Sequence, residues 1–145
     1  MDPVLRFTTV GRQLGYAMYM LLDNACVLDA TGIRKFSAAP RMLREGYRAW
    51  FTGLSFSIAS GLYSYYNLRL RSQAIAQTAD PEKVVEAKKV DKEMSVVRTQ
   101  LVSDVCDLTI PVSALGWVEL DDGVVGLAGT ASSLLGVWGV WRKTA

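Results

Sequence analysis

The sequence contains no histidine, which removes the commonest side-chain general base and transition-metal ligand. Catalysis by a histidine-activated serine or cysteine is therefore excluded. Only two cysteines are present, Cys26 and Cys106, and their apolar surroundings indicate reduced core residues rather than a disulfide. The net charge of +2 is too small to indicate a nucleic-acid partner. We expect neither an enzyme nor a site for a cofactor or metal.

Apolar residues are abundant instead, because half of the 145 residues are hydrophobic. Residues 49–68 and 124–141 hold no charge. A helix crosses a bilayer with roughly 20 apolar residues, and about 17 is the lower limit. Trp50 and Trp141 stand near the ends of these stretches, where aromatic rings favour the membrane–water boundary. We predict a single all-α membrane domain over residues 1–145, with these stretches as two transmembrane helices that pair as an antiparallel hairpin or between copies.

Small residues recur at helical spacing within both predicted spans. In lipid, helices associate where small residues let their backbones approach closely, because apolar burial gains little there. We therefore predict a set of helix-packing and oligomerisation residues: Gly53, Ser57, Gly61, Gly126, Ala128, Gly129, Ser132, Ser133 and Gly136.

Four further segments are predicted around the spans. Residues 4–30 are apolar, but Asp23 roughly cancels their tendency to insert, which favours an interfacial or membrane-packed helix. Residues 33–48 form a basic amphipathic turn, and residues 80–107 have the apolar spacing of an amphipathic loop helix. Residues 108–118 are too short to span, so they are interpreted as a re-entrant or interfacial piece, or as the end of a kinked helix.

Basic residues next to the apolar runs are predicted to contact anionic headgroups, although an ordinary solvated face is the alternative. These membrane-surface residues are Arg34, Lys35, Arg41, Arg44, Arg48, Arg142 and Lys143. The two tails together carry nine lysines and arginines and the connection between the spans carries seven. This small excess favours cytosolic tails, with the connection on the other side of the membrane.

Three stretches together resemble the peroxisomal membrane peroxin eleven family, its fungal form especially. They are YMLLDNACVL at residues 19–28, DLTIPVSALG at 107–116 and VGLAGTASSLLGVW at 125–138. The glycine–serine pattern of the last stretch is the most specific feature. The family motif of Leu22, Asp23 and Asn24 is the next, and the likeness covers essentially the whole chain.

This resemblance implies a multi-pass protein of the peroxisomal membrane with both termini in the cytosol. It implies that the protein promotes membrane elongation and fission through self-association. The implied partners are the bilayer, further copies of the chain, the peroxisomal membrane-protein import machinery and dynamin-class fission machinery. Family members bend membranes with a basic amphipathic helix upstream of the matched region. No such helix precedes Val4, so we expect either a truncated form or a sequence from which the first part of the protein is missing.

A pore for small metabolites is the alternative function. It would require Asp23, Ser55, Ser60, Ser64 and Thr130 to face a shared lumen. A pore needs one continuous polar face along both spans. The spans offer hydroxyls and glycines, which serve helix packing equally well.

Overall fold

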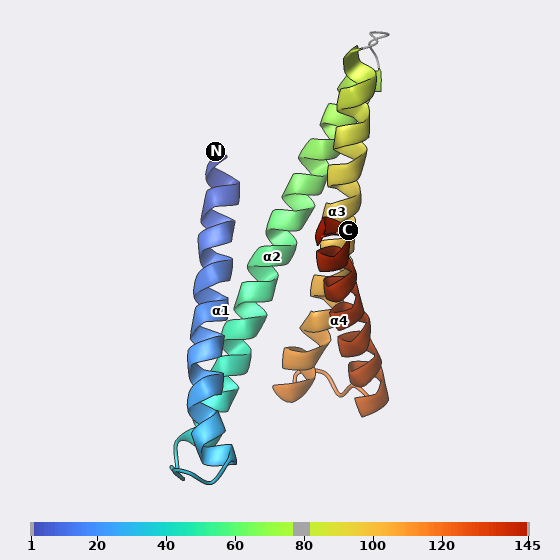
Figure 1. Ribbon diagram of the computed structural model, residues 1–145. Coiled ribbons are helices and arrows are strands. Elements are labelled where there is room, and N and C mark those ends of the chain that lie inside the picture. The colour runs from blue at the N-terminus through green and yellow to red at the C-terminus, as the bar shows by residue number, and fades with distance from the viewer. Residues whose placement is uncertain (1, 77–81, 145) are drawn as a thin grey trace.

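The structure, a computed structural model, describes residues 2–76 and 82–144. These residues form four helices and no strand, which confirms the predicted all-helical class (Figure 1). The helices are α1 (Pro3–Ala30), α2 (Ala39–Ala76), α3 (Glu82–Ala114) and α4 (Asp122–Thr144).

Local capping signals fix both ends of α1. The Asp2 carboxylate accepts a hydrogen bond of 2.9 Å from the Val4 N–H, and Pro3 occupies the first helical position. At the other end, the Thr31 N–H donates to the Val27 carbonyl, and Gly32 adopts a φ of +74°. A side chain at that φ would be strained, so glycine suits the turn out of the helix.

α2 joins two predicted segments, the basic turn within residues 33–48 and the span at 49–68. Their predicted boundary is corrected, because the backbone continues as one helix of 38 residues. The sequence changes from charged to apolar at this point, but it contains no cap or breaker there. Residues 33–38 belong instead to the connection between α1 and α2.

α3 likewise joins the predicted loop helix and most of residues 108–118. The latter are therefore not a separate re-entrant segment, and they agree with the alternative prediction of a helix end. The predicted helix start at Asp80 lies outside the described residues. Pro111 sits inside α3, where it forgoes one backbone hydrogen bond but is fully buried among neighbours. The helix ends where Gly116 adopts a φ of +69° and the Trp117 N–H donates to the Val112 carbonyl.

Each helix of the described chain packs only against its neighbours in sequence, α1 on α2, α2 on α3 and α3 on α4. The result is an open layer rather than a closed bundle (Figure 1). Because α3 runs back between them, α2 and α4 point in the same direction. The predicted antiparallel hairpin of residues 49–68 with residues 124–141 is therefore wrong within one chain.

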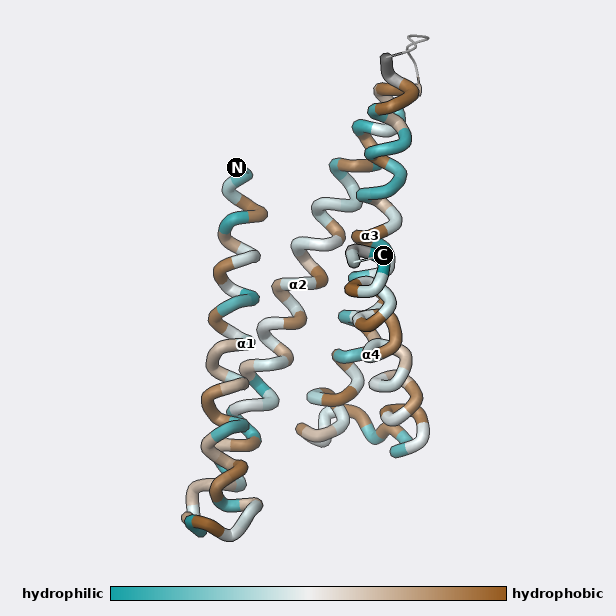
Figure 2. Tube along the Cα trace, in the orientation of Figure 1, coloured by the Kyte–Doolittle hydropathy of each residue, from teal (hydrophilic) through white to brown (hydrophobic). Residues whose placement is uncertain are grey.

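The two central helices extend past the N-terminal end of α1 and the C-terminal end of α4 (Figure 1). We call this extension the charged arm and define it as residues 69–76 of α2 and 82–93 of α3. Figure 2 shows hydrophilic residues gathered along the α3 part of the arm. The arm and both described chain ends thus lie toward one end of the layer, and the α1–α2 and α3–α4 connections lie toward the other.

Candidate membrane-embedded surface and its helix contacts

Burial in this fold is inverted relative to a water-soluble protein. Among the described residues, the buried apolar side chains are Ala39, Leu54, Val90, Met94 and Pro111, and as many are polar, namely Thr8, Ser57, Ser103, Asp104 and Ser132. Large apolar residues lie exposed along the outer helices, for example Phe7, Leu14 and Leu21 on α1 and Leu127, Leu134 and Trp141 on α4. Soluble monomers rarely expose apolar surface on this scale, whereas lipid is a suitable solvent for it.

α4 is the clearest membrane element. Asp122–Arg142 is the only stretch of the described chain both long and apolar enough to cross a bilayer, and just 6% of its apolar window is buried by the rest of the protein. Residues 49–68 do not meet this criterion, because their hydroxyl-bearing and aromatic residues lower the mean hydropathy of the segment. The sequence prediction of two transmembrane helices is thus supported for residues 124–141 only.

α1 has two dissimilar sides. Its apolar residues at 4, 7, 14, 21 and 28 are all exposed. Arg12 and Asp23 are instead half-buried, and the Arg12 Nε atom is fully buried without a hydrogen-bond partner. With 28 residues, α1 is about 42 Å long, more than the roughly 30 Å thickness of a hydrocarbon core. Arg12 and Asp23 thus lie on the side of α1 nearer the protein, and a row of large apolar residues lies on its exposed side.

The contact between α1 and α2 is a close backbone crossing. A Cβ atom added to Gly15 would lie 2.7 Å from the Cα and N atoms of Gly53 and 2.9 Å from the Ala49 carbonyl oxygen. One turn earlier, a Cβ atom on Gly11 would lie 2.8 Å from the Phe56 ring. Gly11 and Gly15 are four positions apart and are thus on one helix face. The sequence interpretation missed this pair, although its spacing is visible in GRQLG.

The contact between α2 and α3 is centred on a buried carboxylate. Asp104 is 2% exposed, and its two oxygens accept hydrogen bonds from the Ser57 hydroxyl at 2.6 Å and the Gln100 amide at 2.8 Å. Near this site, a Cβ atom on Gly61 would lie 2.7 Å from Leu101. Sequence reasoning also missed Asp104, although an isolated acid within the apolar run LVSDVC was the available signal.

The contact between α3 and α4 is a hydroxyl pair. The Ser103 and Ser132 hydroxyl oxygens are 2.9 Å apart, and both residues are buried. A Cβ atom on Gly129 would approach Ile110 at 3.5 Å, an ordinary van der Waals distance. Ala128 is half-buried on the same helix. These α4 positions therefore face the protein.

Other small residues of α4 do not contact another helix of the described chain. A Cβ atom on Gly126 or Gly136 would meet nothing within 4 Å, and Ser133 is exposed. A groove of about 500 Å³ along this side of α4 includes Ser133, Gly136 and Val140. The predicted packing residues thus divide into two groups. Gly53, Ser57, Gly61, Gly129 and Ser132 contact helices of the same chain, and the half-buried Ala128 belongs with them, whereas Gly126, Ser133 and Gly136 are available to another molecule.

The predicted membrane-surface residues lie at both ends of the layer. Arg34 and Lys35 are exposed in the α1–α2 connection, and Arg41, Arg44 and Arg48 are exposed near the start of α2. Of these, Arg48 forms an ion pair of 2.8 Å with Glu45. Arg142 is exposed at the end of α4, and the side chain of Lys143 lies outside the described part.

The Leu22–Asp23–Asn24 motif has a structural position on α1. Leu22 lies against Gly46 of α2, where an added Cβ atom would be 3.5 Å from its side chain. Asp23 is half-buried, and the Asn24 amide donates a hydrogen bond of 2.7 Å to the Met20 carbonyl. The motif thus contributes to the α1–α2 contact.

The residues assigned to a pore do not gather around one space within the chain. Ser55 and Thr130 are exposed and donate hydrogen bonds to carbonyls of their own helices. α2 does not contact α4 in the described chain. Ser64 alone of the five lines a cavity described here. The geometry of a single chain therefore offers no lumen from these side chains.

The Ser103–Ser132 pair permits a first test. We expect Ser132→Ala to lower the free energy of unfolding by about 0.5–1.5 kcal/mol, because a buried hydroxyl loses its partner across the helix contact. Ser133→Ala is the matched control and should change it by less than about 0.5 kcal/mol, because Ser133 is exposed. Unfolding in mixed detergent micelles, followed by tryptophan fluorescence, measures both. Equal losses from the two variants would contradict the assigned contact.

The inverted burial, the polar helix contacts and the exposed apolar α4 define a class, that of helical membrane proteins. Within it, the chain belongs to the peroxisomal biogenesis factor 11 (PEX11) family, whose pattern matches residues 1–141. This confirms the resemblance found in the sequence. Curated relatives of the chain are named peroxisomal membrane proteins, which supports the same location for this chain.

Three fungal relatives illustrate the similarity. Peroxisomal membrane protein PMP30B of Candida boidinii is 24% identical over 99% of this chain and 64% of its own length. PMP27 of Saccharomyces cerevisiae is 23% identical, with the same two coverages. Peroxisomal biogenesis factor 11 of Schizosaccharomyces pombe is 22% identical over 96% of this chain and 57% of its own length. The chain thus spans less than two thirds of these relatives, and no solved structure matches it.

Proposed function

We propose that this chain is the membrane-embedded part of a factor that elongates the peroxisomal membrane before fission, and that it acts through self-association in the bilayer. The observation that carries the proposal is the inverted burial, with serines and an aspartate between helices and large apolar residues outside. Family membership supports the role in peroxisome biogenesis. Recruitment of dynamin-class fission machinery and use of the membrane-protein import machinery belong to the same proposal, by resemblance.

All four helices cross the bilayer in this proposal. Both termini and the charged arm then share one side, and the two short connections share the other. The side with the termini and the arm carries ten Lys and Arg residues, the side with the two short connections carries five, and Arg12 lies between the two sides. This excess favours cytosolic termini and a cytosolic arm. This replaces the sequence expectation that the connection between the two spans lies across the membrane from the tails.

The open side of α4 is the proposed contact between copies. Gly126, Ser133 and Gly136 leave room for a second backbone, and close approach at small residues drives helix association in lipid. Gly53, Ser57 and Gly61 are less suited to this role, because they already contact α1 and α3. Substitutions at Gly129 or Ser132 would disturb α3 as well, so Gly136 is the cleaner position to change.

The test is reconstitution at defined protein density into vesicles of phosphatidylcholine and phosphatidylinositol, followed by cross-linking and imaging. We expect tubules from the unaltered chain, and loss of both tubules and cross-linked dimers from Gly136→Leu. The dimer constant should fall about tenfold, which corresponds to about 1.4 kcal/mol, because the leucine side chain keeps the two backbones apart. Ala131→Leu places the same side chain on the far side of α4 and should retain both activities. Smooth vesicles that contain cross-linked chains would contradict the proposal.

A further inference from the structure

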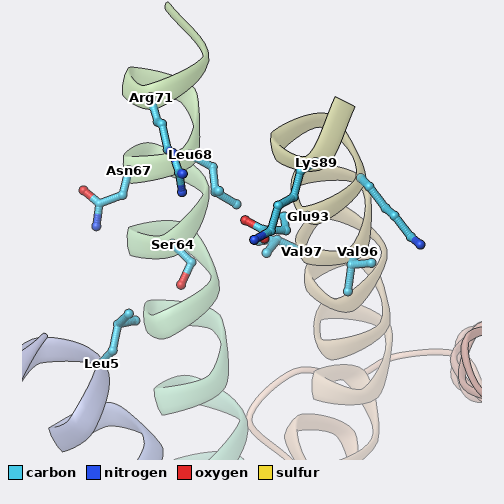
Figure 3. A pocket seen from close by; sticks show the side chains of 10 residues that line it. Leu5, Ser64, Asn67, Leu68, Arg71, Lys89, Glu93, Val96 and Val97 are labelled. Atoms are coloured by element: carbon cyan, nitrogen blue, oxygen red, sulfur yellow. The ribbon is translucent and has the colours of Figure 1, made fainter. Parts of the chain in front are cut away.

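A second cavity, of about 740 Å³, lies where the charged arm meets the rest of the layer. Its size falls within the range of about 300–1,000 Å³ that is typical of small-molecule sites. Figure 3 shows that its lining comes from three helices, with Leu5 on α1, Leu68 and Arg71 on α2, and Lys89 and Val97 on α3. None of these residues belongs to the helix contacts described above.

The cavity combines two kinds of lining. Leu5, Leu68, Val96 and Val97 provide an apolar part, whereas Arg71, Lys89 and Lys92 provide a basic part. In Figure 3, Leu68 points toward α3 and Lys89 points toward α2 across the space. A ligand that fits both parts has an apolar chain attached to an anionic group.

The basic residues of the cavity differ in whether they form an ion pair with a neighbouring acid. Arg71 donates hydrogen bonds to Glu86 through Nε, at 3.1 Å, and through a terminal nitrogen, and this carboxylate raises the pKa of Arg71. Neither Lys89 nor Lys92 forms an ion pair with an acid of the described chain. Glu93 is the one acid in the lining, so basic groups outnumber it three to one.

The N-terminal end of α1 completes the apolar part. The Tyr63 hydroxyl donates a hydrogen bond of 2.7 Å to Asp2, which fastens the start of α1 to α2 and brings Leu5 to the cavity. This hydrogen bond also holds the pKa of Asp2 below its ordinary value. Val4, next to Leu5 in the sequence, belongs to the exposed apolar face of α1. The apolar part of the cavity therefore lies beside that exposed face.

We propose that this cavity binds one anionic glycerophospholipid, with its phosphate at Lys89, which points across the space toward α2, and an acyl chain against Leu5, Leu68 and Val97. Basic pockets at the cytosolic end of membrane helices bind anionic headgroups in this manner. The inference rests on the membrane location that the proposed function assumes, but it does not require tubulation or self-association. It assigns the charged arm a lipid-sensing role beyond spacing the helices.

The test uses the full chain, purified in a non-ionic detergent, with retained lipid counted by native mass spectrometry. The probes are phosphatidic acid, phosphatidylinositol, phosphatidylcholine and free glycerol 3-phosphate. We expect one retained anionic lipid per chain, weak retention of phosphatidylcholine and no competition from glycerol 3-phosphate. Equal retention of phosphatidylcholine would overturn the proposal. Full competition by glycerol 3-phosphate would do so as well, because it would identify a site for a free phosphate ester.

Charge variants around the cavity sharpen the test. Lys89→Gln should weaken binding about fivefold, since a basic group near the headgroup is worth about 1 kcal/mol. Lys88→Gln makes the same change in net charge on an exposed residue outside the lining and should leave affinity unchanged. Glu93→Gln should strengthen binding, because it removes the only acid of the lining. Equal losses of lipid affinity from Lys88→Gln and Lys89→Gln would refute a localised site.

The Gly136→Leu chain separates this inference from the proposed function. If lipid binding were unaffected in this tubulation-deficient chain, the lipid site would stand independently of the proposed function.

Discussion

Alanine at Gly15 is expected to lower the free energy of unfolding by about 1–3 kcal/mol, the usual cost of overpacking a close contact. The added methyl would lie 2.7 Å from the backbone of Gly53 and 2.9 Å from the Ala49 carbonyl. Backbone atoms cannot rotate away as a flexible side chain can, so α1 and α2 must separate. Unfolding in mixed micelles measures the loss, and a disulfide between cysteines introduced on the two helices would report the separation directly.

Gly139→Ala provides a control with the opposite sign. Gly139 is also a helical glycine in an apolar segment, but its added Cβ atom would meet nothing within 4 Å, and it lies outside the proposed contact between copies. Alanine is favoured over glycine in a helix interior by up to about 1 kcal/mol, so this variant should be as stable as the parent or more stable. Stabilisation by both variants would show that helix propensity dominates and that the α1–α2 crossing is looser than described.

Much of the helical content was predictable because apolar spacing and capping residues act locally. The apolar run that became α4 and the glycine suited to end α1 could both be read from the sequence. The boundary after Arg48 was wrong for a physical reason. A helix ends where its backbone is capped or broken, whereas a change from charged to apolar side chains leaves the backbone unaffected.

The packing and direction of the helices were harder to predict. Asp23 and the charges of residues 80–107 indicated an interfacial helix and a loop helix rather than spans. The cost of an acid in lipid depends on partners supplied by other helices, such as Ser57 for Asp104. Sequence spacing identified rows of small residues, but only the folded chain distinguishes the occupied Gly53 from the open Gly136.

After the Gly15 substitution, removal of the Ser57 hydroxyl is expected to cause the second largest loss in the free energy of unfolding. Asp104 is almost fully buried, and Ser57→Ala would leave its carboxylate with Gln100 as its one remaining hydrogen-bond donor. An under-satisfied buried charge costs about 1–3 kcal/mol, and the low dielectric of a membrane protein interior increases the penalty. Ser55→Ala, two residues away, is the matched control, because Ser55 is exposed and donates only to the Phe51 carbonyl of its own helix.

A double-mutant cycle separates this hydrogen bond from general effects of the substitutions. Asp104→Asn keeps the shape of the side chain and removes the charge, so a missing serine hydroxyl should matter less in its presence. We therefore expect Ser57→Ala to cost at least about 1 kcal/mol less in the Asp104→Asn background than in the parent chain. The same unfolding assay in mixed micelles measures all four proteins. Additive losses would mean that the α2–α3 contact is maintained by shape alone, and that the buried carboxylate is available for a role other than packing.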